Sequence, residues 1–206
     1  MLQLDNLREF QTFGALLGCA SSLYQLIPMI CQLAVARQAE IEEHVSLDCS
    51  HEFDRLYGLI WGWHPEEDPA QSSRLSEECK QAGRIMQITL QLFLFSAYYG
   101  TEYDGVNYCR VREVARTLVS EATDIAKRTW FSSWSNANYW FIIIIASYAV
   151  DDDQQRECLK YIAEDWPLAR AMRKCLTWLW ARPEEAYGLE GLTRAQKVLQ
   201  INVLLN

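Results

Sequence analysis

The feature that most constrains the fold is an apolar run at residues 139–150, which stops at three consecutive aspartates. The run reads Tyr-Trp-Phe-Ile-Ile-Ile-Ile-Ala-Ser-Tyr-Ala-Val and holds no charged residue. A membrane-spanning helix needs about 20 apolar residues, and this run has less than two-thirds of that length. Consecutive isoleucines also suit a strand. The flanking segments have helical spacing, however, so we expect a helix that is buried on all sides.

Apolar side chains recur at helical spacing along most of the chain. The spacing predicts helices over residues 13–44, 51–61, 72–99, 106–130 and 138–150, and three more after residue 151. Pro28 predicts a kink in the first helix or a start just before it. No alternating segment indicates a strand. The sequence therefore predicts an all-α fold of seven or eight antiparallel helices, in a single domain over residues 1–206.

Three local patterns predict where the last helices begin. Asp151 or Asp152 forms a capping box with Gln155, and the acids favour a helix N-terminus. Pro167 suits the first turn of a helix that ends near residue 181. The segment 193–196, Thr-Arg-Ala-Gln, is a second capping box, which predicts a final helix reaching residue 204.

The charge balance bears on the partners that such a chain can bind. The formal charge is −8 and the isoelectric point is about 4.9. DNA binding depends on Lys and Arg displacing counterions, so we expect no direct nucleic-acid binding by this chain. The same charge argues against an anionic membrane. The first residues lack the pattern of a signal peptide, and the seven cysteines lack disulfide or zinc spacing. We therefore expect reduced thiols in an intracellular, nuclear or cytoplasmic protein.

The acid cluster after the apolar run is the strongest candidate for chemistry. Asp151, Asp152, Asp153 and Glu157 lie close together in sequence. Aspartates at the end of an apolar helix can hold Mg²⁺ and a diphosphate, as in class I terpene cyclases. The second metal motif of those enzymes is not evident, and helix capping explains the same acids. We expect caps, with no metal, cofactor or catalytic residue; the alternative is a Mg²⁺-dependent enzyme acting on an apolar isoprenoid-type metabolite.

The tryptophans offer a second candidate site. The chain holds eight of them, and six lie between residues 130 and 180. Trp178 and Trp180 cannot share one helix face, so we expect one in the core and the other partly exposed. Aromatic side chains commonly fill cores. The alternative is a pocket for a small apolar ligand, lined by Trp140, Trp178 and Trp180. No nucleotide-binding loop, serine-nucleophile motif or zinc-hydrolase motif is present.

Several landmarks together resemble a known family. They are Trp140-x5-Ala-Ser147-x-Ala149, the acids followed by Gln-Gln-Arg156, Ala169-Arg-Ala-Met172, and Leu176-x-Trp178-x-Trp180. The segments 16–27 and 59–63, Leu-Ile-Trp-Gly-Trp, are similar too. Over about residues 14–182 the chain resembles the fungal-specific transcription factor domain, the C-terminal regulatory region of Zn₂Cys₆ regulators. It departs from full regulators in lacking the six-cysteine DNA-binding cluster and in its shorter central segment.

This resemblance implies a regulatory half without a DNA reader. In such regulators the helical region is thought to sense ligands, to self-associate or to restrain an activation segment. We therefore expect a transcription-regulator-like domain, tied to a metabolic gene cluster of secondary metabolism. Its expected partners are another protein or a second copy of the chain, and a small apolar ligand. A third hypothesis is that the chain is a pure interaction scaffold that pairs with a full-length regulator.

Overall fold

The computed structural model describes residues 11–44, 47–65, 73–101, 106–129, 135–162, 167–185 and 187–201. These ranges form eight helices and no strand. The helices are α1 (Gln11–Glu43), α2 (Cys49–Trp61), α3 (Ser73–Tyr99), α4 (Val106–Thr129), α5 (Ser135–Ser147), α6 (Asp152–Lys160), α7 (Pro167–Trp180) and α8 (Gly188–Val198). The all-α prediction is confirmed. No described helix is long and apolar enough to cross a membrane.

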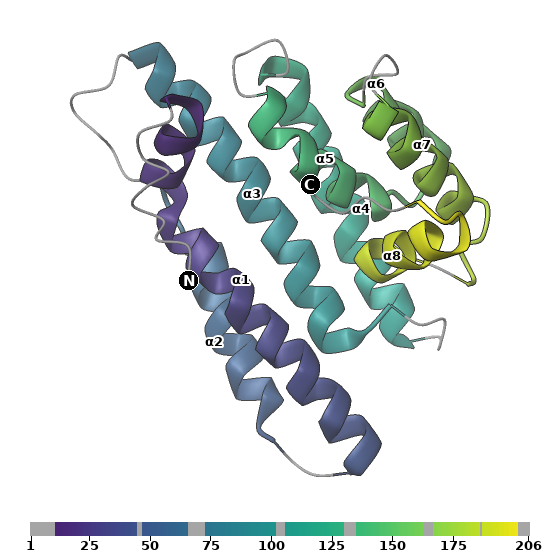
Figure 1. Cartoon of the computed structure of the whole chain (residues 1–206). Coiled ribbons are helices and arrows are strands. Elements are labelled where there is room, and N and C mark those ends of the chain that lie inside the picture. The colour runs from purple at the N-terminus through teal and green to yellow at the C-terminus, as the bar shows by residue number, and fades with distance from the viewer. Residues whose placement is uncertain are drawn as a thin grey trace.

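Helix α3 is the centre of the molecule. It lies between the hairpin of α1 and α2 on one side and α4 and α5 on the other (Figure 1). One buried cluster joins α3 to α1 and α2 through residues such as Met86, Leu90 and Leu94. A second joins it to α4–α8 through Ile85, Ile88 and others. Apolar residues on nearly every side of α3 therefore connect two cores into one body.

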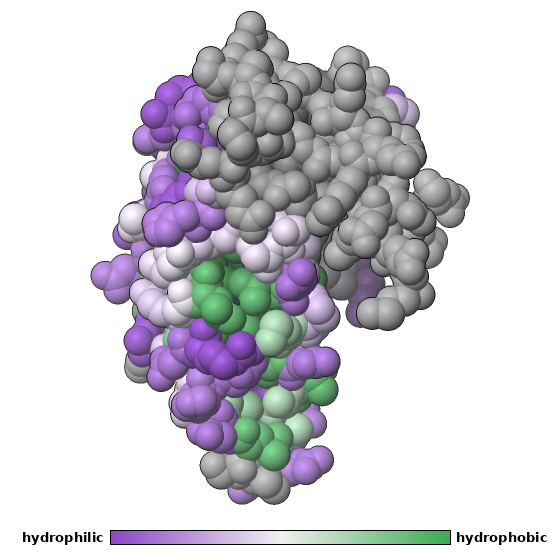
Figure 2. Space-filling model, turned by 90° about the vertical axis from the view of Figure 1, so that its left-hand side faces the viewer, coloured by the Kyte–Doolittle hydropathy of each residue, from purple (hydrophilic) through white to green (hydrophobic). Residues whose placement is uncertain are grey.

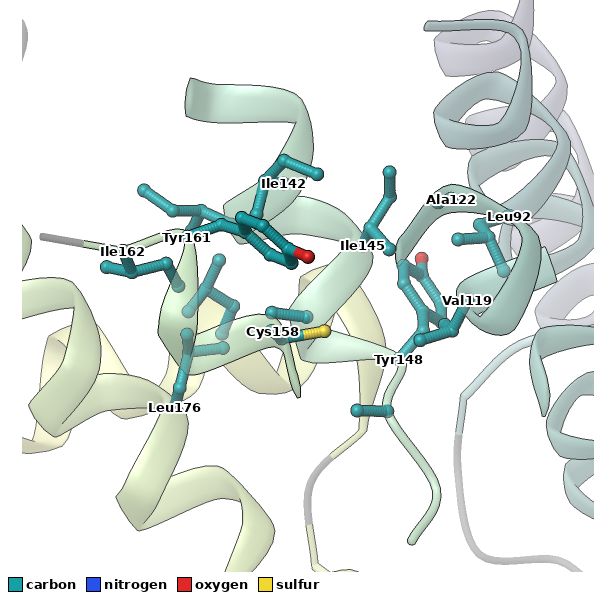
Figure 3. Packing of buried hydrophobic residues seen from close by; sticks show 14 of the residues in the cluster. Leu92, Val119, Ala122, Ile142, Ile145, Tyr148, Cys158, Tyr161, Ile162 and Leu176 are labelled. Carbon is teal, nitrogen blue, oxygen red and sulfur yellow. The ribbon is translucent and has the colours of Figure 1, made fainter. Parts of the chain in front are cut away.

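The apolar run predicted to be a buried helix forms α5 and the turn after it. Ile142, Ile143 and Ile145 are buried, which confirms the helical interpretation over the strand propensity of isoleucine. Tyr148, just past the helix end, is fully buried and points toward Leu92 and Val119 (Figure 3). Its hydroxyl accepts a 2.7 Å hydrogen bond from the Ser96 hydroxyl of α3, and its carbonyl accepts one from the Tyr187 hydroxyl. The end of α5 is thereby fixed to α3 and to the start of α8.

Two helix predictions were wrong in detail. Pro28 neither kinks nor starts α1; the departure from helical geometry is at Ala20, with φ −132° and ψ 21°. The last helix begins at Gly188 rather than at Thr193, whose hydroxyl donates to the Leu189 carbonyl from inside α8. Gly188 has φ +63°, and a Cβ there would lie 2.5 Å from Cε1 of Tyr148. Packing under Tyr148 decides this helix start, and only glycine has both the backbone freedom and the space.

The Leu59–Trp63 landmark has a packing role. Trp63 is buried beside Gly83 of α3, where an added Cβ would come within 2.5 Å of the indole Cη2. This close approach lets α3 pack against the end of α2. The family landmark is therefore a contact between two helices far apart in sequence.

The cysteines differ in part from the expectation. Cys31, Cys49, Cys109, Cys158 and Cys175 are free thiols, as predicted. Cys79 is disulfide-bonded, so the expectation that all seven are reduced is wrong for this residue. Burial raises the pKa of Cys158 to about 12 and that of Cys175 to about 11. Both thiols therefore stay protonated and behave as core residues.

Candidate functional site

The acid cluster lies at the start of α6, on the turn that follows α5. Asp151 is the N-cap, and its Oδ1 accepts a 3.0 Å hydrogen bond from the backbone N–H of Gln154. Asp152 and Asp153 occupy the first helical turn and are exposed, the Asp153 side chain by 88%. Asp153 pairs with Arg156 on its own helix. All three acids thus stand at the positive end of a helix, where a negative charge is stabilising.

The capping box is present with a different partner from the one predicted. Gln154, not Gln155, closes it, because Asp151 is the cap and the third helical position follows from it. The Gln154 carbonyl oxygen accepts from the N–H of Val150 at 3.1 Å. Its amide donates to the Arg116 carbonyl at 2.7 Å and to the Ser120 hydroxyl at 2.9 Å. Gln154 is buried, so one side chain joins the cap of α6 to the backbone of α4.

Glu157 joins α6 to α4 by charge. Its carboxylate lies 2.5 Å from Nζ of Lys160 and 3.7 Å from Nζ of Lys127 on α4. It also accepts a 3.1 Å hydrogen bond from the Tyr161 hydroxyl. The hydrogen bond from Lys160 is the main reason that the pKa of Glu157 falls below its usual range. The carboxylate is therefore engaged by cations of the chain itself.

These contacts define what the acid cluster can do chemically. Among the residues that the structure describes, no group of three His, Cys, Asp or Glu side chains has an arrangement that could hold a metal ion. The aspartates face solvent as caps, and Glu157 is bound by lysines. The acid cluster has the geometry of a capped N-terminus of α6 that is joined to α4. This geometry gives no support to the Mg²⁺-dependent alternative.

The three candidate tryptophans pack against the second core cluster without stacking on one another. Trp180 is half-buried, and its Nε1–H donates a 3.0 Å hydrogen bond to the Ala146 carbonyl near the end of α5. Trp178 is also half-buried, with the Arg182 guanidinium 4.8 Å from its ring centroid. Both rings are partly exposed, so the prediction that one of them lies fully in the core is wrong, and the predicted partial exposure of the other is confirmed. Trp140 contacts its neighbour Tyr139 edge-on. Of the three rings, Trp180 joins α7 to α5 by a hydrogen bond.

A polar pocket lies elsewhere, where α8 meets the end of α3. Its volume is about 390 Å³, which is within the range of small-molecule sites. The lining residues are Thr101, Glu185, Tyr187, Glu190, Gly191, Thr193, Arg194 and Lys197. Thr101 donates a 2.6 Å hydrogen bond to Glu190, and Arg194 donates to the Glu185 carbonyl. Charges of both signs therefore line this pocket, and the sequence patterns that we considered did not indicate it.

An aromatic cluster between α2 and the end of α3 was also missed. Its members are Phe53, Tyr57, Trp61, Phe95, Tyr98 and Tyr99. Tyr57 and Trp61 stack at 4.0 Å, and Phe53 stacks on Tyr98 at 4.5 Å. The i, i+4 spacing of these aromatics on each helix was the available signal. The cluster holds the hairpin to α3, a structural role.

Comparison with known proteins agrees with the landmarks described above. The sequence model of the fungal specific transcription factor domain matches residues 2–185, which includes the whole of the region of resemblance. No curated protein and no solved structure gave a match. The matched residues span all of α1–α7 and most of the buried core. This chain belongs to the fungal-specific transcription factor domain family.

Proposed function

We propose that this transcription-regulator domain acts in the nucleus through association with other proteins rather than by reading DNA or by catalysis. The observation that carries the proposal is its packed interior. The side chains between the helices form two apolar clusters that share Tyr99, Val114 and Phe141. Because the interior between the helices is packed with apolar side chains, a protein partner would contact the surface of the domain. The net charge of −8 supports the same conclusion, since phosphate contacts need basic side chains.

A reporter assay tests this proposal. The full chain is fused to a heterologous DNA-binding domain, and transcription from the matching promoter is compared with that domain alone. We expect the fusion to change reporter expression. A fusion carrying Gly188→Ala, which disturbs packing under Tyr148, is the control for dependence on the folded domain. Expression equal to that of the DNA-binding domain alone would refute the proposal. So would sequence-specific duplex binding by the purified chain at physiological salt.

The polar pocket favours a second function, the sensing of a small molecule. Because Glu185, Glu190, Arg194 and Lys197 all line one cavity, the ligand that best matches its charges is a small zwitterion such as a free amino acid. This differs from the apolar ligand expected from the sequence. Thermal denaturation with each of the common amino acids tests it, with Lys197→Ala as the variant expected to lose the effect. The absence of any ligand-dependent stabilisation would eliminate this function.

A further inference from the structure

The apolar surface of the described chain is unevenly distributed. Seven large hydrophobic residues are exposed, and five of them lie on the hairpin of α1 and α2: Val35, Ile41, Leu47, Tyr57 and Leu59. The other two are Val198, the last residue of α8, and Leu199, its C-cap. The hairpin extends away from the remaining helices in Figure 1 and packs mainly against α3. Figure 2 shows apolar and hydrophilic residues mixed on this side of the molecule. The hairpin is therefore the part of the described surface richest in exposed large apolar side chains.

On α1 the exposed residues Val35 and Ile41 extend a row of apolar residues along the helix, which the exposed polar Gln38 interrupts. The α1 stripe consists of Ile27, Cys31, Ala34, Val35 and Ile41, which helical spacing places on one face. Val35 is 71% exposed and Ile41 is 58% exposed, whereas Ile27 and Ala34 are half-buried. The stripe borders the face of α1 that holds its core residues, and Ile27 at one end of it packs against the core cluster of α1–α3. At about 1.5 Å per residue it is roughly 20 Å long, the length of a four-turn helix.

The stripe is uncharged along most of its length and ends in a strongly acidic region. No charged residue occurs between residues 10 and 36. The acidic tip, residues 37–55, carries Glu40, Glu42, Glu43, Asp48, Glu52 and Asp54 against two arginines. Both arginines are already paired, Arg37 with Glu40 and Arg55 with Glu52. Four acids of the tip consequently lack a cationic partner among the described residues.

We propose that the α1 stripe docks an amphipathic helix of a partner protein, with basic residues at the end that overlies the acidic tip. Apolar side chains of the partner would cover Val35 and Ile41, and its Lys or Arg side chains would neutralise the acids beyond them. A second copy of this chain fits less well, because its own stripe ends in the same acids and supplies no compensating charge. This inference rests on the proposed function, since it names the surface and partner of that association.

The test uses the full chain and a synthetic helix as the probe. A labelled peptide of leucine and lysine, about 15 residues long with leucine at helical spacing, is titrated with the protein at physiological salt. Fluorescence anisotropy gives Kd. We expect binding of the order of micromolar, as for other small interfaces. The counterpart with glutamate in place of lysine should not bind, because the acidic tip repels it.

Three single variants locate the site. Val35→Lys and Ile41→Lys each replace an exposed apolar residue of the stripe with a positive charge, which repels the lysines of the peptide. We expect each variant to raise the Kd of the peptide by about tenfold. Val198→Lys makes the same change at a 55% exposed residue of α8 and should alter Kd by less than about twofold. Circular dichroism checks that each variant is folded. If one stripe variant unfolds, the other still decides the result.

Three results would overturn the inference. Val198→Lys could raise the Kd of the peptide as much as the stripe variants do, which would show that the basic peptide is attracted non-specifically to an acidic protein. The glutamate peptide could bind equally well, which would remove the charge argument. Light scattering could show a dimer that Val35→Lys converts to monomers, which would assign the stripe to a second copy. If the reporter fusion is active while the peptide fails, the proposed function stands and this surface is wrong for it.

Discussion

Replacing Gln154 with leucine removes the side chain that closes the cap of α6 and attaches it to α4. Leucine keeps most of the volume but loses three hydrogen bonds, to Val150, Arg116 and Ser120, with lengths of 3.1, 2.7 and 2.9 Å. Each hydrogen bond contributes about 1 kcal/mol net. Three of them give an expected loss of about 3 kcal/mol in the free energy of unfolding. Gln154 is only 8% exposed, so water cannot easily replace the lost partners.

Gln155→Leu is the matched control, since it makes the same chemical change one residue further on. The Gln155 side chain is half-buried and makes no hydrogen bond to the described residues, so we expect a change within about 0.5 kcal/mol. Urea denaturation followed by far-UV circular dichroism measures both variants against the wild type. For a chain of this size, a loss of about 3 kcal/mol corresponds to a fall in Tm of roughly 6–12 °C.

The sequence pattern and the structure make opposite predictions here. If Gln155→Leu costs as much as Gln154→Leu, the capping box uses Gln155 and the contacts to α4 are wrong. If neither variant loses more than about 0.5 kcal/mol, hydrogen bonding at this turn does not stabilise the domain. Either result would refute the reasoning.

Three further perturbations test the packing and the charge network. Gly188→Ala places a Cβ 2.5 Å from the Tyr148 ring at φ +63°, so we expect a loss of about 2–5 kcal/mol, measured by urea denaturation; an unchanged midpoint would contradict the helix start described. Gly83→Ala pushes against the Trp63 indole at 2.5 Å and should cost about 1–3 kcal/mol with a change in tryptophan emission; an unchanged spectrum would contradict the close contact. The hydrogen bond from Lys160 holds the pKa of Glu157 in the folded protein below its ordinary value of 4.5. The ionised carboxylate therefore stabilises the fold above about pH 4.5, and this stabilisation is lost as the pH falls through the pKa of the folded state. The stability difference between wild type and Glu157→Gln should accordingly be full at neutral pH and shrink below about pH 4.5; a difference that grows on acidification would reverse the assignment.

The helices were predictable because their signals are local. Periodicity of apolar side chains requires only neighbours within a few turns, and it located α2, α3, α4 and α7 to within about two residues. The burial of α5 followed from its composition, since a segment apolar on every side has no face suited to water. The start of α8 could not be predicted in this way. It depends on Tyr148, which is 40 residues earlier, and on the space that Gly188 leaves beside its ring.

The candidate site shows the same division. The acids after α5 were expected to be caps, and the structure places Asp151 as the N-cap. The sequence pattern allowed either Asp151 or Asp152 as the cap and predicted Gln155 as the partner, because spacing alone does not distinguish the two caps. Burial against α4 makes Gln154 the partner. The polar pocket and the aromatic cluster of the hairpin join residues from different helices, so no single segment carried their signal.

The sequence by itself determined the all-α class, the order of the helices and the family, because these follow from periodicity and from landmarks that each lie within one segment. Only the tertiary structure decided which polar groups are partnered, which tryptophans brace which helices, and where apolar residues remain exposed. Val35 and Leu23 are both apolar residues of α1, yet one is 71% exposed and the other is fully buried. The difference arises because α3 covers one face of α1 and leaves the other in contact with solvent.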